Sequence, residues 1–187
     1  MSSPNGAFEW PKGAHVFVDG TKSKDYIIVA ALVAPADVAS ARVAVRGLCH
    51  PGSTSIHMRK ESSQRRAKII EGLKLIGTKT YLFRCCQPGL DDRERRRRCL
   101  NQLLDHCARE GVHRLTLERD EPIYRWERQY FVQATRERSM GPQFEYHWLQ
   151  RNQEPLLWVP DAVAWSYARG RAERQRVNPL IAGDETV

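Results

Sequence analysis

Residues 15–33 read HVFVDGTKSKDYIIVAALV, and this stretch decides the expected fold. Residues 15–18 are a short apolar strand that runs into Asp19-Gly20. Residues 26–33 are a continuous apolar run whose β-branched content is typical of a buried strand. A polar turn separates the two runs, so we expect a hairpin whose second strand is central in a sheet.

Helix and strand patterns alternate after this hairpin. Helices are expected over 35–46, 62–76, 91–110, 123–138 and 160–169, and strands over 80–83, 113–117 and 144–149. The order predicts an α/β fold with a mixed sheet flanked by helices. We expect residues 1–13 to form a flexible N-terminal arm, residues 14–177 a single domain and residues 178–187 a flexible C-terminal tail.

The composition is that of a soluble globular chain, with 41% hydrophobic and 28% charged residues. The five cysteines have no regular spacing, which argues against a disulfide framework and a structural zinc site. No apolar run reaches the ~18 residues of a membrane span, and the first residues lack the pattern of a signal peptide. We therefore expect a cytoplasmic protein without membrane contact.

The positive charge is concentrated in one part of the chain. The net charge is +8, and residues 59–110 hold 14 Lys and Arg against 7 Asp and Glu. Such a basic field attracts polyanions such as nucleic acid, and an arginine guanidinium can donate two hydrogen bonds to the oxygens of one phosphate. The alternatives are an ordinary solvated helix face or a surface that binds an acidic protein. The predicted nucleic-acid contacts are Arg59, Lys60, Arg65, Arg66, Arg93, Arg96 and Arg97.

Three of these arginines lie on the extension of a predicted core stripe. Residues 100, 103, 104 and 107 recur at the spacing of a buried helix face. Extended backwards, the same stripe reaches Arg93, Arg96 and Arg97. We expect these side chains to project past the core, into solvent or onto a ligand.

Acidic residues stand where strands and helices of the predicted sheet end or begin. Asp19 follows the first strand, Glu118 follows the strand over 113–117, and Asp161 opens the last apolar helix. Sites in α/β sheets gather at the carboxyl ends of strands. Converging carboxylates repel one another unless divalent cations neutralise them, and Mg²⁺ prefers oxygen ligands. The pattern predicts a Mg²⁺ or Mn²⁺ site for phosphodiester hydrolysis, with Glu61 or Asp120 as a fourth ligand.

Each acid also has a simpler interpretation. Asp19-Gly20 is a common turn pair, and Asp161 after Pro160 is a typical first-turn or capping acid. Glu118 belongs to a charged run, and Glu61 lies near a helix start. His57 is a candidate for proton transfer or phosphate binding, although a lone histidine is more often structural.

Two short segments resemble a known superfamily. They are VFVDG at 16–20 and LLWVPDAVAW at 156–165, in which a strand runs into an acid and an apolar helix carries another. This order resembles the ribonuclease H-like superfamily and, more narrowly, the bacterial domain of unknown function 3800 family; residues 56–61 resemble a further patch of that family. The resemblance implies a nuclease-like fold over 14–177. That family usually has Glu-Ser after the first Asp, where this chain has Gly20-Thr21, so one ligand sometimes supplied there is absent.

Two functions from different classes follow. The first is a metal-dependent nuclease in which Asp19, Glu118 and Asp161 are catalytic. The alternative is a non-catalytic basic module that binds nucleic acid or an acidic protein. A homo-oligomer formed through exposed aromatic side chains, such as Trp126, Tyr130 and Trp148, is a weaker expectation.

Overall fold

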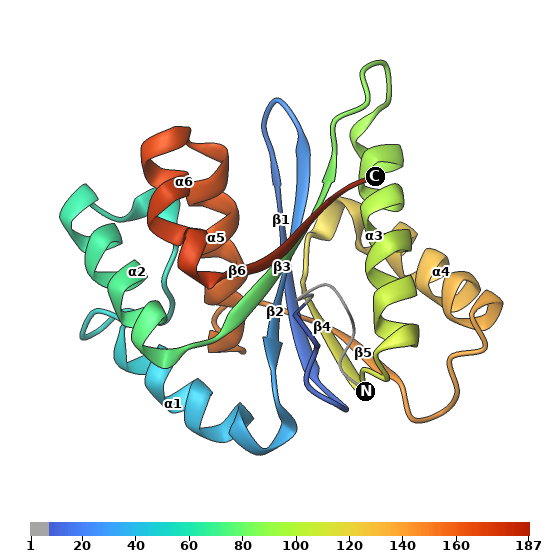
Figure 1. Cartoon of the computed structure of the whole chain (residues 1–187), viewed down its shortest axis with the longest axis horizontal. Coiled ribbons are helices and arrows are strands. Elements are labelled where there is room, and N and C mark those ends of the chain that lie inside the picture. Colours follow the sequence, from blue (N-terminus) through green and yellow to red (C-terminus); the bar gives the residue numbers. More distant parts are fainter. Residues whose placement is uncertain (1–7) are drawn as a thin grey trace.

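The computed structural model describes residues 8–187 and arranges six strands in one mixed sheet (Figure 1). The spatial order is β5-β4-β1-β2-β3-β6. The strands are β1 (His15–Lys22), β2 (Tyr26–Val33), β3 (Lys79–Cys85), β4 (Arg114–Glu118), β5 (Glu145–Leu149) and β6 (Ile181–Thr186). β2 is antiparallel to β1 and β3, whereas β4 and β5 run parallel to β1, and β6 runs parallel to β3. The predicted mixed sheet is confirmed.

The predicted hairpin forms, with one change that matters for the site. All eight residues of β2 are buried, as expected for a central strand covered on both faces. β1 does not end at Val18 as predicted but continues to Lys22, because its antiparallel ladder with β2 extends to the pair Lys22↔Tyr26. Asp19 is therefore inside the strand, opposite Val29, rather than in the turn.

Helices cover both faces of the sheet (Figure 1). One face carries α1 (Val38–Gly47), α2 (Ser63–Ile76), α5 (Trp158–Ala168) and α6 (Arg171–Val177); the other carries α3 (Asp92–Arg109) and α4 (Glu121–Glu137). Short 3-10 turns lie at Pro35–Asp37, Met58–Lys60, Pro155–Leu157 and Asn178–Leu180. Within residues 8–187, no helix has the length and apolarity needed to cross a membrane.

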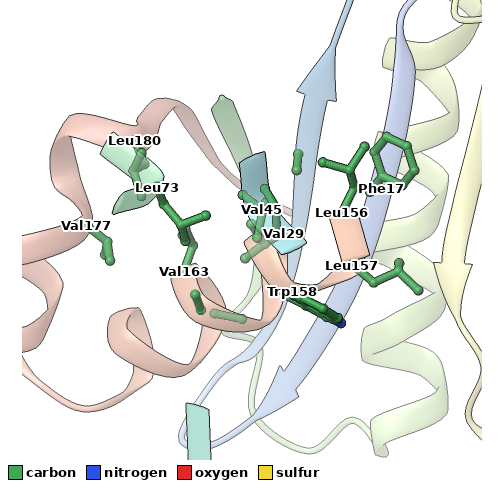
Figure 2. Packing of buried hydrophobic residues seen from close by; sticks show 14 of the residues in the cluster. Phe17, Val29, Val45, Leu73, Leu156, Leu157, Trp158, Val163, Val177 and Leu180 are labelled. Atoms are coloured by element: carbon green, nitrogen blue, oxygen red, sulfur yellow. The ribbon is translucent and has the colours of Figure 1, made fainter. Parts of the chain in front are cut away.

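Each face has its own apolar core. Strand alternation sends Phe17 of β1 and Val29 of β2 towards α5, where Val163 lies in the same cluster (Figure 2). Their neighbours Val18 and Ile28 point the other way, into a cluster that includes Leu100 of α3. The α5 segment is apolar on nearly all sides because it lies between the sheet and the outer helices.

The C-terminal segment is ordered, which corrects the prediction of a flexible tail over 178–187. Residues 171–177 form α6, and β6 pairs with β3 from Thr80↔Ile181 onwards. The carboxylate of Glu185 accepts hydrogen bonds from Tyr81 (2.8 Å) and Gln102 (3.0 Å). The polar composition of this strand concealed it, because its side chains are held by polar partners rather than by an apolar face.

The predicted N-terminal arm is also partly corrected. Residues 1–7 lie outside the described part of the chain. Trp10 is only 6% exposed, and its ring stacks on that of His106 with centroids 5.4 Å apart. Trp10 therefore anchors this segment to the core of the α3 face, and residues 8–13 do not form a flexible arm.

The aromatic side chains expected at a self-association surface belong to the core of the α3 face. Trp126 and Tyr130 stack on each other at 5.6 Å, and Trp148 packs edge-on against Phe131 at 5.3 Å. All three are half-buried and pack against the apolar cluster beneath α3 and α4. The expectation that they are exposed was wrong, and a homo-oligomer remains only a prediction.

Candidate active site

The register of the sheet brings Asp19 and Glu118 to adjacent positions. β1 and β4 are parallel, and their last paired residues are Val18 and Leu117. The next residue on each strand is an acid. Since Phe17 faces α5, Asp19 two residues later faces α5 as well, and Glu118 shares that side.

Asp161 reaches the same place from α5, which packs against β1 and β2. The helix begins at Trp158, so Asp161 lies in its first turn and is only 8% exposed. Its Oδ2 accepts the backbone N–H of Met58 at 3.1 Å. Asp161 therefore does not cap its own helix, and the capping interpretation is wrong, just as the turn interpretation of Asp19 is.

A residue that sequence reasoning missed lies between the acids. The guanidinium of Arg151 donates to both oxygens of Glu118, with Nη2 at 2.7 Å from Oε1 and 2.9 Å from Oε2. Its Nη1 lies 3.6 Å from Oδ2 of Asp161 and also contacts Nδ1 of His57. His57 Nδ1 is itself 3.8 Å from Asp161 Oδ2. The acids, an arginine and a histidine thus form one cluster.

A positional signal for Arg151 was present in the sequence. β5 is parallel to β4, so the residues just after Leu149 lie at the same sheet edge as Glu118. Strand ends bring basic side chains to this edge as well as acids.

Burial and neighbouring negative charge together set the pKa of Asp19. The pKa of Asp19 is raised from 3.8 to about 8, mainly by burial and further by the neighbouring carboxylates of Glu118 and Asp161. The Gly20 N–H, 2.7 Å from Oδ1, and the charge of Arg151 oppose it. Asp19 thus holds its proton at neutral pH unless further positive charge enters.

This shift predicts a pH-dependent gain in stability for Asp19→Asn. In the unfolded chain Asp19 ionises near pH 4, whereas in the folded protein it retains its proton until near pH 8. Wild-type stability therefore falls as pH rises through that window, while the neutral asparagine does not contribute to the fall. We expect the variant to match wild type near pH 4 and to exceed it by on the order of 5 kcal/mol at pH 8. Urea unfolding in EDTA measures this; a difference independent of pH would contradict it.

The donor set fits a hard divalent cation. Three carboxylates come from three different elements, and the charges of Glu118 and Asp161, which together with burial raise the pKa of Asp19, are charges that a cation would neutralise. As the side chains stand, no group of three or more His, Cys, Asp or Glu within residues 8–187 is arranged to hold an ion. Arg151 makes the contacts with Glu118 and Asp161 instead.

The two predicted fourth ligands, Glu61 and Asp120, make no polar contact with the three acids within residues 8–187. Glu61 forms an ion pair with Arg65 at 3.9 Å. Asp120 is exposed and precedes α4, without a side-chain capping bond. Within the described chain, neither is joined to Asp19, Glu118 or Asp161 by a hydrogen bond or ion pair, so their part in a metal site remains a prediction.

The predicted basic contacts separate into two groups on opposite faces of the sheet. Arg59 and Lys60 are exposed at the end of a 3-10 turn on the α5 face, and Arg65 donates to the carbonyl of Leu48. Arg66 donates to the carbonyl of Met58 at 2.8 Å. This group is connected to the acids because Met58 also binds Asp161.

The second group lies on α3. Arg93 is 5.6 Å from the ring centroid of Trp126, and Arg97 pairs with Glu94 at 2.7 Å. Arg96 is 6% exposed, with Nε 2.5 Å from Oε1 of Glu127. The expectation that Arg96 projects past the core onto a ligand was wrong, because a buried acid on α4 pairs with it.

Comparison with known proteins identifies the fold but no family. No protein-family model matches the chain, and no curated protein matches its sequence. A chain in the structure of the PCNA:RNase HII complex from Archaeoglobus fulgidus is similar with a TM-score of 0.52 at 15% identity, over 88% of this chain and 74% of that one. The RNase HII likeness confirms the ribonuclease H-like fold, and at this identity it shows the fold alone.

Proposed function

We propose that this protein is a divalent-metal-dependent nuclease that hydrolyses phosphodiester bonds of nucleic acid at the Asp19, Glu118 and Asp161 cluster. The observation that carries the proposal is the convergence of these three acids from β1, β4 and α5. Crowded carboxylates weaken the folded state, and they are tolerated where a cation or a reaction needs them. The ribonuclease H-like fold agrees with this proposal but does not establish the activity.

In this proposal some residues would bind the metal, and others would position the acids or contact the substrate. Asp19, Glu118 and Asp161 would hold Mg²⁺ or Mn²⁺, with Glu61 or Asp120 as a proposed fourth ligand. When bound, such ions activate a water and stabilise the leaving oxygen of a phosphodiester. The Met58 N–H fixes one oxygen of Asp161, and His57 stands within 3.8 Å of the same oxygen, where it can contact a phosphate or transfer a proton.

Basic and aromatic side chains beside the cluster support nucleic acid as the substrate. Trp165 is one helical turn beyond Asp161, and the guanidinium groups of Arg66 and Arg169 lie 4.2 Å and 4.8 Å from its ring centroid. Stacking holds these guanidinium planes in place, which favours contacts with phosphate oxygens. We propose that Arg66 and Arg169, with the exposed Arg59 and Lys60, bind the backbone on the α5 face.

We also propose that the protein is related to the bacterial domain of unknown function 3800 family, because of the short motifs around Asp19 and Asp161. We propose a cytoplasmic location because of the composition.

Cleavage assays test the proposal directly. End-labelled RNA, DNA and RNA/DNA hybrid substrates are incubated with the purified protein, and we expect cleavage of at least one that requires Mg²⁺ or Mn²⁺ and stops with EDTA. Removal of the metal should lower the rate to near the uncatalysed level, because in this proposal the metal activates the attacking water. Cleavage that persists in EDTA would contradict the metal site.

A non-catalytic nucleic-acid-binding module is the second candidate. Gly20-Thr21 stands where the resembling family carries Glu-Ser, and Arg151 already neutralises Glu118 and contacts Asp161. This function predicts binding that weakens steeply with salt, survives EDTA and produces no turnover. The same substrates in a filter-binding assay at several salt concentrations distinguish the two functions.

A further inference from the structure

We infer that Arg151 is a built-in counter-ion of the acidic cluster, which holds Glu118 and Asp161 in the metal-free protein and is displaced when a divalent cation binds. The inference rests on the proposed function for the identity of the cation. Arg151, which is not one of the acids, thus has a role of its own, and its side chain changes conformation when the cation binds.

The contacts of Arg151 are shared among several groups of the site. Its Nε and Nη2 both donate to Oε1 of Glu118, at 3.0 Å and 2.7 Å, and Nη2 also reaches Oε2 at 2.9 Å. Nη1 turns to Asp161 at 3.6 Å and contacts His57. An ordinary structural ion pair joins one acid, whereas this guanidinium spans two acids and a histidine of the candidate site.

A guanidinium and a metal ion compete for these oxygens. Hydrogen bonds from Arg151 use the lone pairs of Glu118 that a metal would coordinate. Two like charges at one cluster also repel each other. Metal binding at Glu118 and Asp161 therefore favours the departure of the guanidinium, and the loss of its contacts is part of the free energy of binding.

The surroundings allow the side chain to move while the backbone stays in place. The carbonyl of Arg151 accepts the Trp158 indole N–H at 2.7 Å, and the turn closes with Gln153 N–H on Gln150 O at 2.9 Å. The side chain is 22% exposed, so it has a route to solvent. A rotation about its own bonds is enough to release both acids.

Mn²⁺ binding measured by calorimetry tests the inference. Arg151→Met keeps the length of the side chain and removes its charge and its donors. We expect Mn²⁺ to bind this variant at least about tenfold more tightly than wild type, because the competitor is gone. The matched control is Arg138→Met, which removes an arginine that pairs with Asp105 at 2.7 Å away from the cluster and is 16% exposed; its Mn²⁺ affinity should equal that of wild type.

A second measurement uses the wild-type protein, so the inference stays testable if Arg151→Met does not fold. The Nε–H resonances of arginines are followed by NMR during a Mg²⁺ titration. The Arg151 resonance should shift as its bond to Glu118 is lost, and that of Arg138 should not. An unmoved Arg151 resonance at saturating Mg²⁺, or equal Mn²⁺ affinity of a folded Arg151→Met and wild type, overturns the inference.

These results separate the inference from the proposed function. Tighter Mn²⁺ binding by Arg151→Met without cleavage of any substrate supports the inference and counts against the nuclease. Metal-dependent cleavage by wild type with an unchanged Mn²⁺ affinity in Arg151→Met supports the nuclease and overturns the inference.

Discussion

Asp161→Asn is expected to lower metal-dependent cleavage by about a thousandfold or more, equivalent to about 4 kcal/mol in the activation barrier. Asp161 is the acid that α5 brings to the two strand acids, and it is only 8% exposed. Asparagine retains a carbonyl oxygen that can accept the Met58 N–H, which Asp161 accepts at 3.1 Å. It removes the negative charge that the proposed cation needs. The fold should therefore survive while the activity is lost.

Initial rates of Mg²⁺-dependent cleavage at saturating substrate measure this effect. The control is Asp184→Asn on β6, an acid that pairs with Arg84 at 2.6 Å and accepts from Tyr167 at 2.7 Å without contacting the cluster. The cleavage rate of Asp184→Asn should stay within about threefold of wild type, because substitutions of exposed residues usually have small effects. Full activity of Asp161→Asn, with thermal unfolding confirming that the variant is folded, would remove Asp161 from the mechanism.

The position of the acids was predictable because it depends on strand register. Two apolar strands each run into an acid, and the parallel pairing that stops at Val18↔Leu117 leaves Asp19 and Glu118 as the next residues. Strands β1 to β5 and helices α1 to α5 were predictable because their apolar periodicity is strong, whereas the short polar helix α6 was not. The strand over 181–186 was not, because it has little apolar alternation and is held by polar contacts such as Tyr81 with Glu185.

The ion-pair partners of charged side chains could not be predicted from the sequence. Arg96 and Glu127 lie on different helices, and no local pattern links them. The arginine run around residue 96 favours a solvated or ligand-binding face, and this interpretation holds for the exposed Arg93 and Arg97. It fails for Arg96 because tertiary packing places an acid against it.

Glu127→Ala is expected to destabilise the protein by about 3–5 kcal/mol, the usual effect of removing one partner from a buried ion pair. Glu127 is 0% exposed. One of its oxygens is 2.5 Å from Arg96 Nε, and the other accepts the Trp148 indole N–H at 2.8 Å. Without it, the Tyr26 hydroxyl at 2.9 Å is the one hydrogen-bond partner that the buried Arg96 side chain retains within residues 8–187. Its charge is then uncompensated in the core of the α3 face.

Urea unfolding by circular dichroism measures the loss, with Glu137→Ala as the matched control because Glu137 is exposed on the same helix. The control should change stability by less than about 0.5 kcal/mol. The double variant Arg96→Met with Glu127→Leu should recover most of the loss, because it removes both charges and fills the space with apolar groups. If Glu127→Ala lowers the free energy of unfolding by less than about 1 kcal/mol, the ion pair with Glu127 does not fix the buried position of Arg96. The Arg96 side chain would then reach solvent, as the stripe of residues 93, 96 and 97 predicts.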